Sequence, residues 1–178
     1  MQSQNSANLF PAFYVGNYDH VLDAQGRVSL PSDWRNKDQE TELVMIPARD
    51  NALLLLPLAT MMEFTAKAGK LAIANPKMQK ALAYLGSVSS RCRCDKQGRM
   101  ALKREQLDSI GVKKNLKLIG AFSHIRICAP ENWTQPDNPE EYFDAIQEVS
   151  DGNDGLEALG GLLGKVKYFN TASLRTGI

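Results

Sequence analysis

Two short stretches of the sequence carry the same chemistry: Asp, two variable residues, Gly and Arg. The first runs from Asp23 to Arg27, and the second runs from Asp95 to Arg99, 72 residues further on. An Arg guanidinium presents its donors in a planar fork that matches a carboxylate, a phosphate or the edge of a guanine base. An Arg held at a fixed point of a rigid turn is therefore suited to contact a planar or anionic partner.

Each stretch is predicted to form the turn of a β-hairpin, with Asp23, Gly26, Asp95 and Gly98 as the turn-forming residues. The Asp side chain can accept hydrogen bonds from nearby backbone N–H groups, and the Gly allows the positive φ that a tight reversal needs. The alternative is that each Arg only pairs with the Asp of its own turn, a contact that contributes little at a surface. The repetition of the whole phrase, with Gln25 and Gln97 at the same inner position, favours the functional interpretation.

The similarity between the two stretches extends into their surroundings, which indicates a duplicated unit of about 80 residues. A unit of this size is short of apolar surface, so the two copies are expected to fold together. Short helices are expected after the turns, at 32–35 and 104–110. The predicted strands around the turns are 18–22, 43–46 and 53–56 in the first copy and 90–94, 116–119 and 125–128 in the second.

With both phrases in this order, residues 14–133 resemble the MraZ family, whose members contain two tandem AbrB-type halves. The matching segments are YVGNYDHVLDAQGRVSLPSDWRN, RCRCDKQGRMALKREQLDSIGV and IGAFSHIRICAPENW. The resemblance implies a mostly β fold with short helices (α+β), in which the two repeats form a swapped-hairpin β-barrel. It also implies a homo-oligomeric ring that binds double-stranded DNA at short direct repeats in the promoter of the division and cell-wall gene cluster. The Arg of each phrase contacts DNA in that family, which corresponds to Arg27 and Arg99 here.

The expected organisation follows from the repeats and from composition. It comprises a flexible N-terminal extension (1–13), the first repeat (14–60), a helical connector (61–85), the second repeat (86–133), an acidic C-terminal helix (134–150) and a disordered tail (151–178). Apolar residues of the connector segment recur at mixed helical spacings and are expected to pack in the core, with a neighbouring subunit as the alternative. These residues are Met61, Phe64, Leu71, Ile73, Met78, Leu82 and Leu85.

Charge is distributed unevenly along a chain whose net charge is only +1. Residues 91–104 contain six basic residues and one acidic residue, whereas residues 131–157 contain nine acidic residues and no basic one. A basic cluster can be no more than a solvated face, but on a repeated turn it favours a polyanionic partner. The predicted DNA-binding residues are Arg27 and Arg99 in the major groove, Gln25, Lys96 and Gln97 beside them, and Arg91, Arg93 and Lys103 on phosphates. Because family members often carry a basic residue at the position of Gln25, the first repeat is expected to bind phosphate more weakly.

The strand before the second turn alternates Arg and Cys. A period of two places Arg91 and Arg93 on one face and Cys92 and Cys94 on the other. A metal site is the alternative for the thiols, but C-x-C on a strand lacks the loop geometry of C-x-x-C ligands, and Cys128 is the sole further Cys. The Cys side chains are therefore expected to pack in the core, and neither a metal nor a cofactor is expected.

The sequence contains no recognisable catalytic arrangement, and structural roles are expected for His20 and His124. We therefore predict a sequence-specific DNA-binding transcriptional regulator, not an enzyme, with no small-molecule substrate. No apolar run approaches the roughly 18 residues of a membrane helix, and no secretory signal is visible, so a soluble, cytoplasmic and nucleoid-associated protein is expected. The competing interpretation is a protein-interaction or antitoxin-like assembly module that uses the C-terminal extension.

Overall fold

The computed structural model describes residues 13–35, 40–134, 138 and 140–144. The chain divides into two compact units, Met1–Trp133 and Thr134–Ile178. In the second unit, residues 140–144 are helical, and the remainder of the expected acidic helix and the expected tail lie outside the described residues. The same holds for residues 1–12 of the expected N-terminal extension. Among the helices of the described ranges, none is long and apolar enough to span a membrane.

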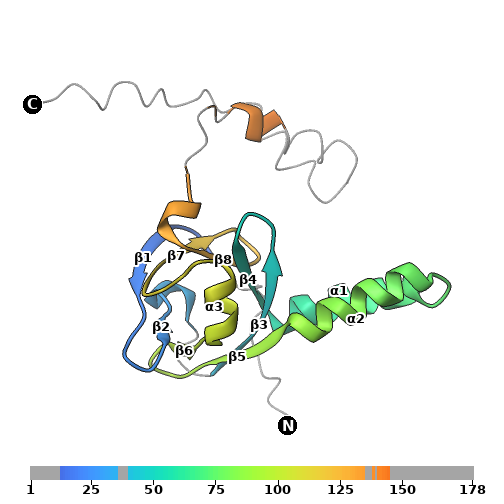
Figure 1. The fold of residues 1–178 in the computed structure, drawn as a ribbon, viewed down its shortest axis with the longest axis horizontal. Helices are drawn as coiled ribbons and strands as arrows, with labels where there is room; N and C mark the ends of the chain where they lie inside the picture. Colours follow the sequence, from blue (N-terminus) through green and yellow to red (C-terminus); the bar gives the residue numbers. More distant parts are fainter. Residues whose placement is uncertain (1–12, 36–39, 135–137, 139, 145–178) are drawn as a thin grey trace, which may run out of the picture. The chain divides into compact units, whose positions relative to one another are not determined.

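The first unit contains one antiparallel sheet of eight strands in the order β1-β7-β8-β4-β3-β5-β6-β2 (Figure 1). The strands are β1 (Asn17–Val21), β2 (Arg27–Ser29), β3 (Thr41–Ala48), β4 (Ala52–Pro57), β5 (Ser90–Cys94), β6 (Arg99–Ala101), β7 (Asn115–Gly120) and β8 (Ile125–Cys128). The two end strands, β1 and β2, are joined by the first turn, where the Asp23 N–H donates to the Arg27 carbonyl at 2.9 Å. The sheet therefore curls into a nearly closed barrel.

Strand pairing interlocks the two repeats. The first strand of each repeat pairs with the third strand of the other repeat: β1 pairs with β7, and β5 pairs with β3. The registers are equivalent, since Tyr18 lies opposite Leu118 and Ser90 lies opposite Met45. The second strands of the two repeats, β2 and β6, pair with each other. The prediction of a mostly β, swapped-hairpin barrel with short helices is therefore confirmed.

Helices follow both turn strands and join the two repeats, as expected, and a further short helix that was not predicted follows β8. The helices are η1 (Ser32–Trp34), α1 (Leu58–Ala72), α2 (Pro76–Val88), α3 (Arg104–Ser109) and η2 (Pro130–Asn132). Asn75 caps α2, because its side-chain oxygen accepts from the Met78 N–H at 3.1 Å. Just beyond α3, Gly111 has a φ of 76°, a left-handed conformation that glycine adopts at little cost.

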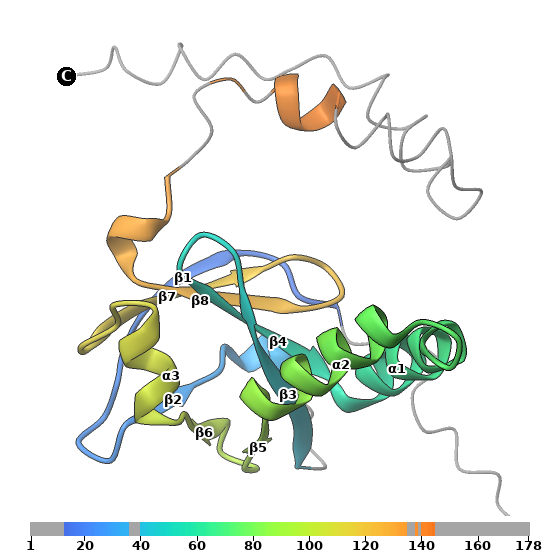
Figure 2. The same cartoon turned by 45° about the vertical axis from the view of Figure 1, so that its right-hand side comes forward.

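The α1–α2 hairpin does not pack into the barrel core, so that prediction was wrong. Figures 1 and 2 show the two helices side by side and projecting away from the strands. Phe64 is 50% exposed, Ile73 is 80% exposed, and no described residue of α2 is buried. Met61, Met78, Leu82 and Leu85 are only partly buried, and the side chain of Leu71 lies outside the described part of the chain. The reason is geometric: the helices contact each other and strands β3 and β4, and these contacts leave part of their apolar surface facing solvent.

The barrel interior is filled by alternate residues of the strands. Strand β5 shows this clearly, because Ser90, Cys92 and Cys94 are buried while Arg91 and Arg93 are exposed. Cys92 and Cys94 join the main core cluster, and Cys128 belongs to a smaller one. All three thiols are free, and burial raises the pKa of Cys94 to about 11. The predicted core packing of the Cys side chains is confirmed.

Candidate nucleic-acid interface

Both Asp-x-x-Gly-Arg phrases fold into tight turns with the same hydrogen bonds. In the first turn, Asp23 Oδ1 accepts from the backbone N–H of Gln25 at 2.9 Å and of Arg27 at 2.8 Å. The corresponding distances to Asp95 Oδ1 in the second turn are 3.0 Å from Gln97 and 2.8 Å from Arg99. The glycines adopt the positive φ that closes the turns, 72° at Gly26 and 82° at Gly98. One carboxylate therefore organises the backbone of each turn.

The same carboxylate also holds the Arg side chain. Nε of Arg27 lies 2.7 Å from Asp23 Oδ2, and Nε of Arg99 lies 2.9 Å from Asp95 Oδ2. The pairing within each turn, considered above as an alternative, is thus present. It occupies one edge of the guanidinium, while the side chains keep 33% and 42% of their surface exposed. The pairing is compatible with outward contact because it fixes the direction in which the remaining guanidinium N–H groups point.

Backbone hydrogen bonds lower the pKa of both turn carboxyls. For Asp23 the largest cause is the hydrogen bond from the Arg27 backbone N–H, and for Asp95 it is the one from Arg99. The Arg side chains lower these pKa values further. Both carboxylates are therefore ionised at neutral pH and remain acceptors for the turn.

Pairing of β2 with β6 brings the two Arg residues onto one face. Arg27 lies opposite Ala101, and Arg99 lies opposite Ser29. Residues directly opposite each other in an antiparallel pair point to the same side, as do residues two apart on one strand. The intervening residues, Val28 and Met100, are buried. Arg27 and Arg99 therefore lie on the same outer face of the barrel, although they are far apart in sequence.

Reciprocal hydrogen bonds tie each turn to the strand that follows the other. The Leu30 N–H donates to the Gly98 carbonyl at 2.8 Å, and the Leu102 N–H lies 3.5 Å from the Gly26 carbonyl. Both leucines are buried. The two turns are thus fixed relative to each other by the swapped strands and not only by their own hairpins.

The remaining predicted residues at the turns are exposed but play different parts. Gln25 holds Arg27, since its Oε1 accepts from Nη2 at 2.8 Å. The Gln97 carbonyl accepts a hydrogen bond from Arg35, and the side chains of Gln97 and Lys96 are exposed. Lys103 is exposed just before α3.

Strand β5 extends the outer face, as its alternation predicts, but its charge is partly neutralised. Arg93 Nη2 lies 3.1 Å from Glu42 Oε1, and Arg93 Nε lies 3.5 Å from Glu40 Oε2. Both acids belong to or precede β3, which pairs with β5. The count of basic residues along 91–104 did not include the acidic residues of the neighbouring strand, because the sequence does not show which strands pair. Arg91 is exposed on the same face of β5.

Arg35 is a contributor that sequence reasoning missed. Its Nε donates to the Leu30 carbonyl at 2.7 Å, and its Nη1 donates to the Gln97 carbonyl at 2.7 Å. A methyl group placed on Gly98 would collide with this guanidinium. Arg35 of the first repeat therefore braces the turn of the second. The sequence contains one indication of this role. Arg35 is a cation at a position where the second repeat has the apolar Leu107.

Comparisons with known proteins find relatives that align with most of the chain. A family model described as "MraZ protein, putative antitoxin-like" matches residues 13–82. A protein named transcriptional regulator MraZ from Finegoldia magna is 28% identical over 146 residues, covering 82% of this chain and 98% of the relative. Proteins of the same name from Caldicellulosiruptor bescii and Lachnoclostridium phytofermentans are 29% and 28% identical. Those alignments cover 67% and 76% of this chain and 82% and 96% of the relatives.

Proposed function

Because the chain belongs to the MraZ family of transcriptional regulators, we propose that it regulates transcription by binding specific DNA sequences through its two Asp-x-x-Gly-Arg turns. The observation that carries this proposal is the placement of Arg27 and Arg99 on one outer face by the β2–β6 pair. Bidentate contact from Arg to guanine O6 and N7 is the commonest specific contact in the major groove. Gln25, Lys96 and Gln97 would lie beside these contacts.

Phosphate contacts would hold the register of the protein on the duplex. Arg91 and Lys103 are exposed cations for which the described residues offer no ion-pair partner. Arg93 would have to leave Glu42 and Glu40 or share itself with them, so it is the weakest member of the predicted set. Such contacts provide affinity that does not depend on sequence and falls with added salt.

A homo-oligomer, in the form of a ring, would multiply these contacts. The exposed large apolar side chains of the α1–α2 hairpin support this part of the proposal, because their burial against another copy would remove apolar surface from water. Several protomers on one assembly would raise the effective concentration of turns at neighbouring sites. Short direct repeats, in the promoter of the division and cell-wall gene cluster, are the proposed target.

The test uses the purified full chain and sheared DNA from its own genome. Retained fragments are sequenced, and a labelled duplex from the most enriched fragment is compared with a scrambled duplex of equal length by fluorescence anisotropy from 50 to 300 mM salt. We expect enrichment of repeated short sites, tighter binding to the enriched duplex, and a steep fall of affinity with salt. Equal affinity for both duplexes at every salt concentration would contradict sequence-specific binding.

A further inference from the structure

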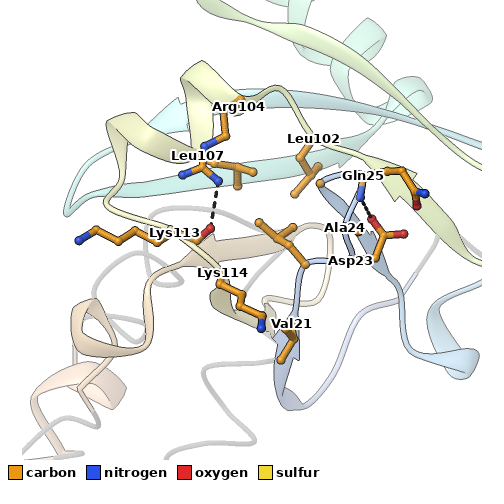
Figure 3. A pocket seen from close by; sticks show the side chains of 11 residues that line it. Val21, Asp23, Ala24, Gln25, Leu102, Arg104, Leu107, Lys113 and Lys114 are labelled. Atoms are coloured by element: carbon orange, nitrogen blue, oxygen red, sulfur yellow. Dashed lines mark hydrogen bonds between the residues drawn. The ribbon is translucent and has the colours of Figure 1, made fainter.

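An open cleft of about 830 Å³ lies beside the first turn. Figure 3 shows its two sides, with Asp23 and Gln25 of the turn on one and Arg104, Lys113 and Lys114 on the other. The cleft is lined by residues from both repeats, since the turn comes from the first copy and the cations come from the second. It is a feature of the swapped fold and could not form within a single repeat.

The cationic side of the cleft has one cation that is engaged and two that are available. Arg104 lies 2.7 Å from Asp108 and donates to the Lys113 carbonyl at 2.9 Å, a contact drawn in Figure 3. It therefore fixes the loop that carries the lysines. Among the described residues, no carboxylate forms an ion pair with Lys113 or Lys114, and both side chains are exposed. Two lysines that are neighbours in sequence thus line the cleft, and neither forms an ion pair with a described residue. The Asp23 carboxylate, on the other side of the cleft, is already paired with Arg27.

The corresponding space beside the second turn is built differently. The repeat offset places Arg35 where the first-turn cleft has Leu107, and the Arg35 guanidinium packs against Gly98. By contrast, nothing approaches within 4 Å of the position of a methyl group on Gly26. Strands β3 and β7 are related by an offset of 73 residues, one more than the turns, so Glu40 corresponds to Lys113. Glu40 pairs with Arg93 at 3.5 Å. The second turn is therefore filled and partly acidic at the position where the first is open and basic.

Within the turns themselves, the second turn carries the additional positive charge and the first does not. The second turn carries Lys96, whereas the first has Ala24 at the same position. The cation that the first turn lacks is supplied across the cleft by Lys113 and Lys114. Each turn thus has a lysine nearby, but from a different part of the fold.

We propose that the cleft beside the first turn binds a phosphate group of the DNA backbone through Lys113 and Lys114, while Arg27 on the neighbouring strand contacts the bases. This inference rests on the proposed function and extends it to residues outside the repeated phrases. A Lys ammonium is a compact point charge that suits a phosphate oxygen, and its contact with the backbone carries no sequence information. The first repeat would then bind phosphate as strongly as the second repeat does, whereas Gln25 alone predicts weaker binding by the first.

The test replaces both lysines, Lys113→Gln with Lys114→Gln, and leaves Arg104 in place because it holds the loop. The matched control removes the same charge from exposed positions of α2, Lys77→Gln with Lys80→Gln. Because the α1–α2 hairpin is part of the proposed oligomer interface, the control is used only if it keeps the oligomer mass of the wild type. Affinity for the enriched and scrambled duplexes is measured by anisotropy at several salt concentrations, with thermal unfolding and light scattering to verify fold and assembly. For the cleft variant we expect about tenfold weaker binding to both duplexes at 0.1 M salt. We also expect a slope of log affinity against log salt that is shallower by about 2 for each protomer engaged.

The outcomes separate this proposal from the one on which it rests. If the wild-type chain binds neither duplex, the proposed function fails, and the variants are not needed to show it. If the wild-type chain binds but the cleft variant keeps the affinity and the salt slope of the α2 control, the cleft proposal is overturned while the function stands. A third arm titrates inorganic phosphate and follows the amide resonances of Lys113 and Lys114. Saturable shifts in that arm, combined with unchanged DNA binding by the variant, would assign the cleft to a free anion and would also overturn the proposal.

Discussion

Arg27 and Arg99 lie diagonally across the β2–β6 pair, each one strand away from the other and two positions along it. This spacing corresponds to about 7–8 Å between Cα atoms. Each side chain is held by an Asp of its own turn, at 2.7 Å for Arg27 and 2.9 Å for Arg99. Two guanidinium groups with fixed directions are therefore presented together on one outer face.

The first prediction concerns base contact by Arg99. Arg99→Ala should weaken binding to the enriched duplex by about 1–3 kcal/mol, with a smaller loss on the scrambled duplex. Arg99→Lys keeps the positive charge but cannot make the bidentate contact, so its specificity should resemble that of the Ala variant. Anisotropy at fixed salt measures both. Retention of full specificity by Arg99→Lys would show that charge alone matters at this position.

The second prediction concerns the pKa of Asp95. The backbone N–H of Arg99 is the largest cause of its lowering and survives replacement of the side chain. In Arg99→Ala the Asp95 pKa should therefore rise but stay below the ordinary Asp value, as measured by a carboxyl NMR titration. Because the folded-state pKa is lowered, the stabilisation from this carboxylate is present above the ordinary Asp pKa and is lost as the pH falls through the lowered value. An ordinary pKa in the variant would contradict the role of the backbone.

The third prediction uses the difference between the two turn glycines. Gly26→Ala meets open space, so its cost is the strain of a positive φ, about 1–2 kcal/mol. Gly98→Ala carries the same strain and also displaces Arg35 from the Leu30 and Gln97 carbonyls, so it should cost more. Urea unfolding of the single variants, and of both combined with Arg35→Ala, measures the coupling. We expect the extra cost of Gly98→Ala to disappear in the Arg35→Ala background, and a constant extra cost would refute the bracing contact.

The fourth prediction separates core packing from assembly. Met100 is fully buried beneath the β2–β6 pair, so Met100→Ala should lower the free energy of unfolding by about 2–5 kcal/mol. Phe64→Ser combined with Ile73→Ser, at exposed positions of the α1–α2 hairpin, should leave the monomer fold intact and reduce the oligomer mass. Circular dichroism and light scattering report the two effects. An unchanged mass would remove the hairpin from the proposed interface.

The sequence was sufficient for the strands and turns but not for the surroundings of the turns. The Asp-x-x-Gly-Arg phrase sets its own geometry through local hydrogen bonds, and alternation sorted Arg91 to Cys94 correctly between the two faces. Pairing between strands distant in sequence decides what lies next to each turn, and local patterns carry no information on that. The neutralisation of Arg93 by Glu42 and the bracing by Arg35 were therefore not predicted.

The α1–α2 hairpin shows a second limit of sequence reasoning. Apolar spacing revealed that Phe64 and Ile73 belong to an apolar surface, but it does not say whether that surface faces the same molecule or another. The helical character of the connector (61–85) was predicted correctly, although the helices begin at Leu58 and end at Val88.

The divergence of the two interlocked repeats gives the molecule a polarity. Two identical chains assembled in this way would carry equal turns and match a palindrome, as symmetric dimers do. Here both halves are covalently joined and have diverged. For example, the first repeat has Arg35 where the second repeat has Leu107. The two ends of the outer face that carries Arg27 and Arg99 therefore differ permanently. In the proposed complex, a bound protomer would distinguish the two directions along the double helix.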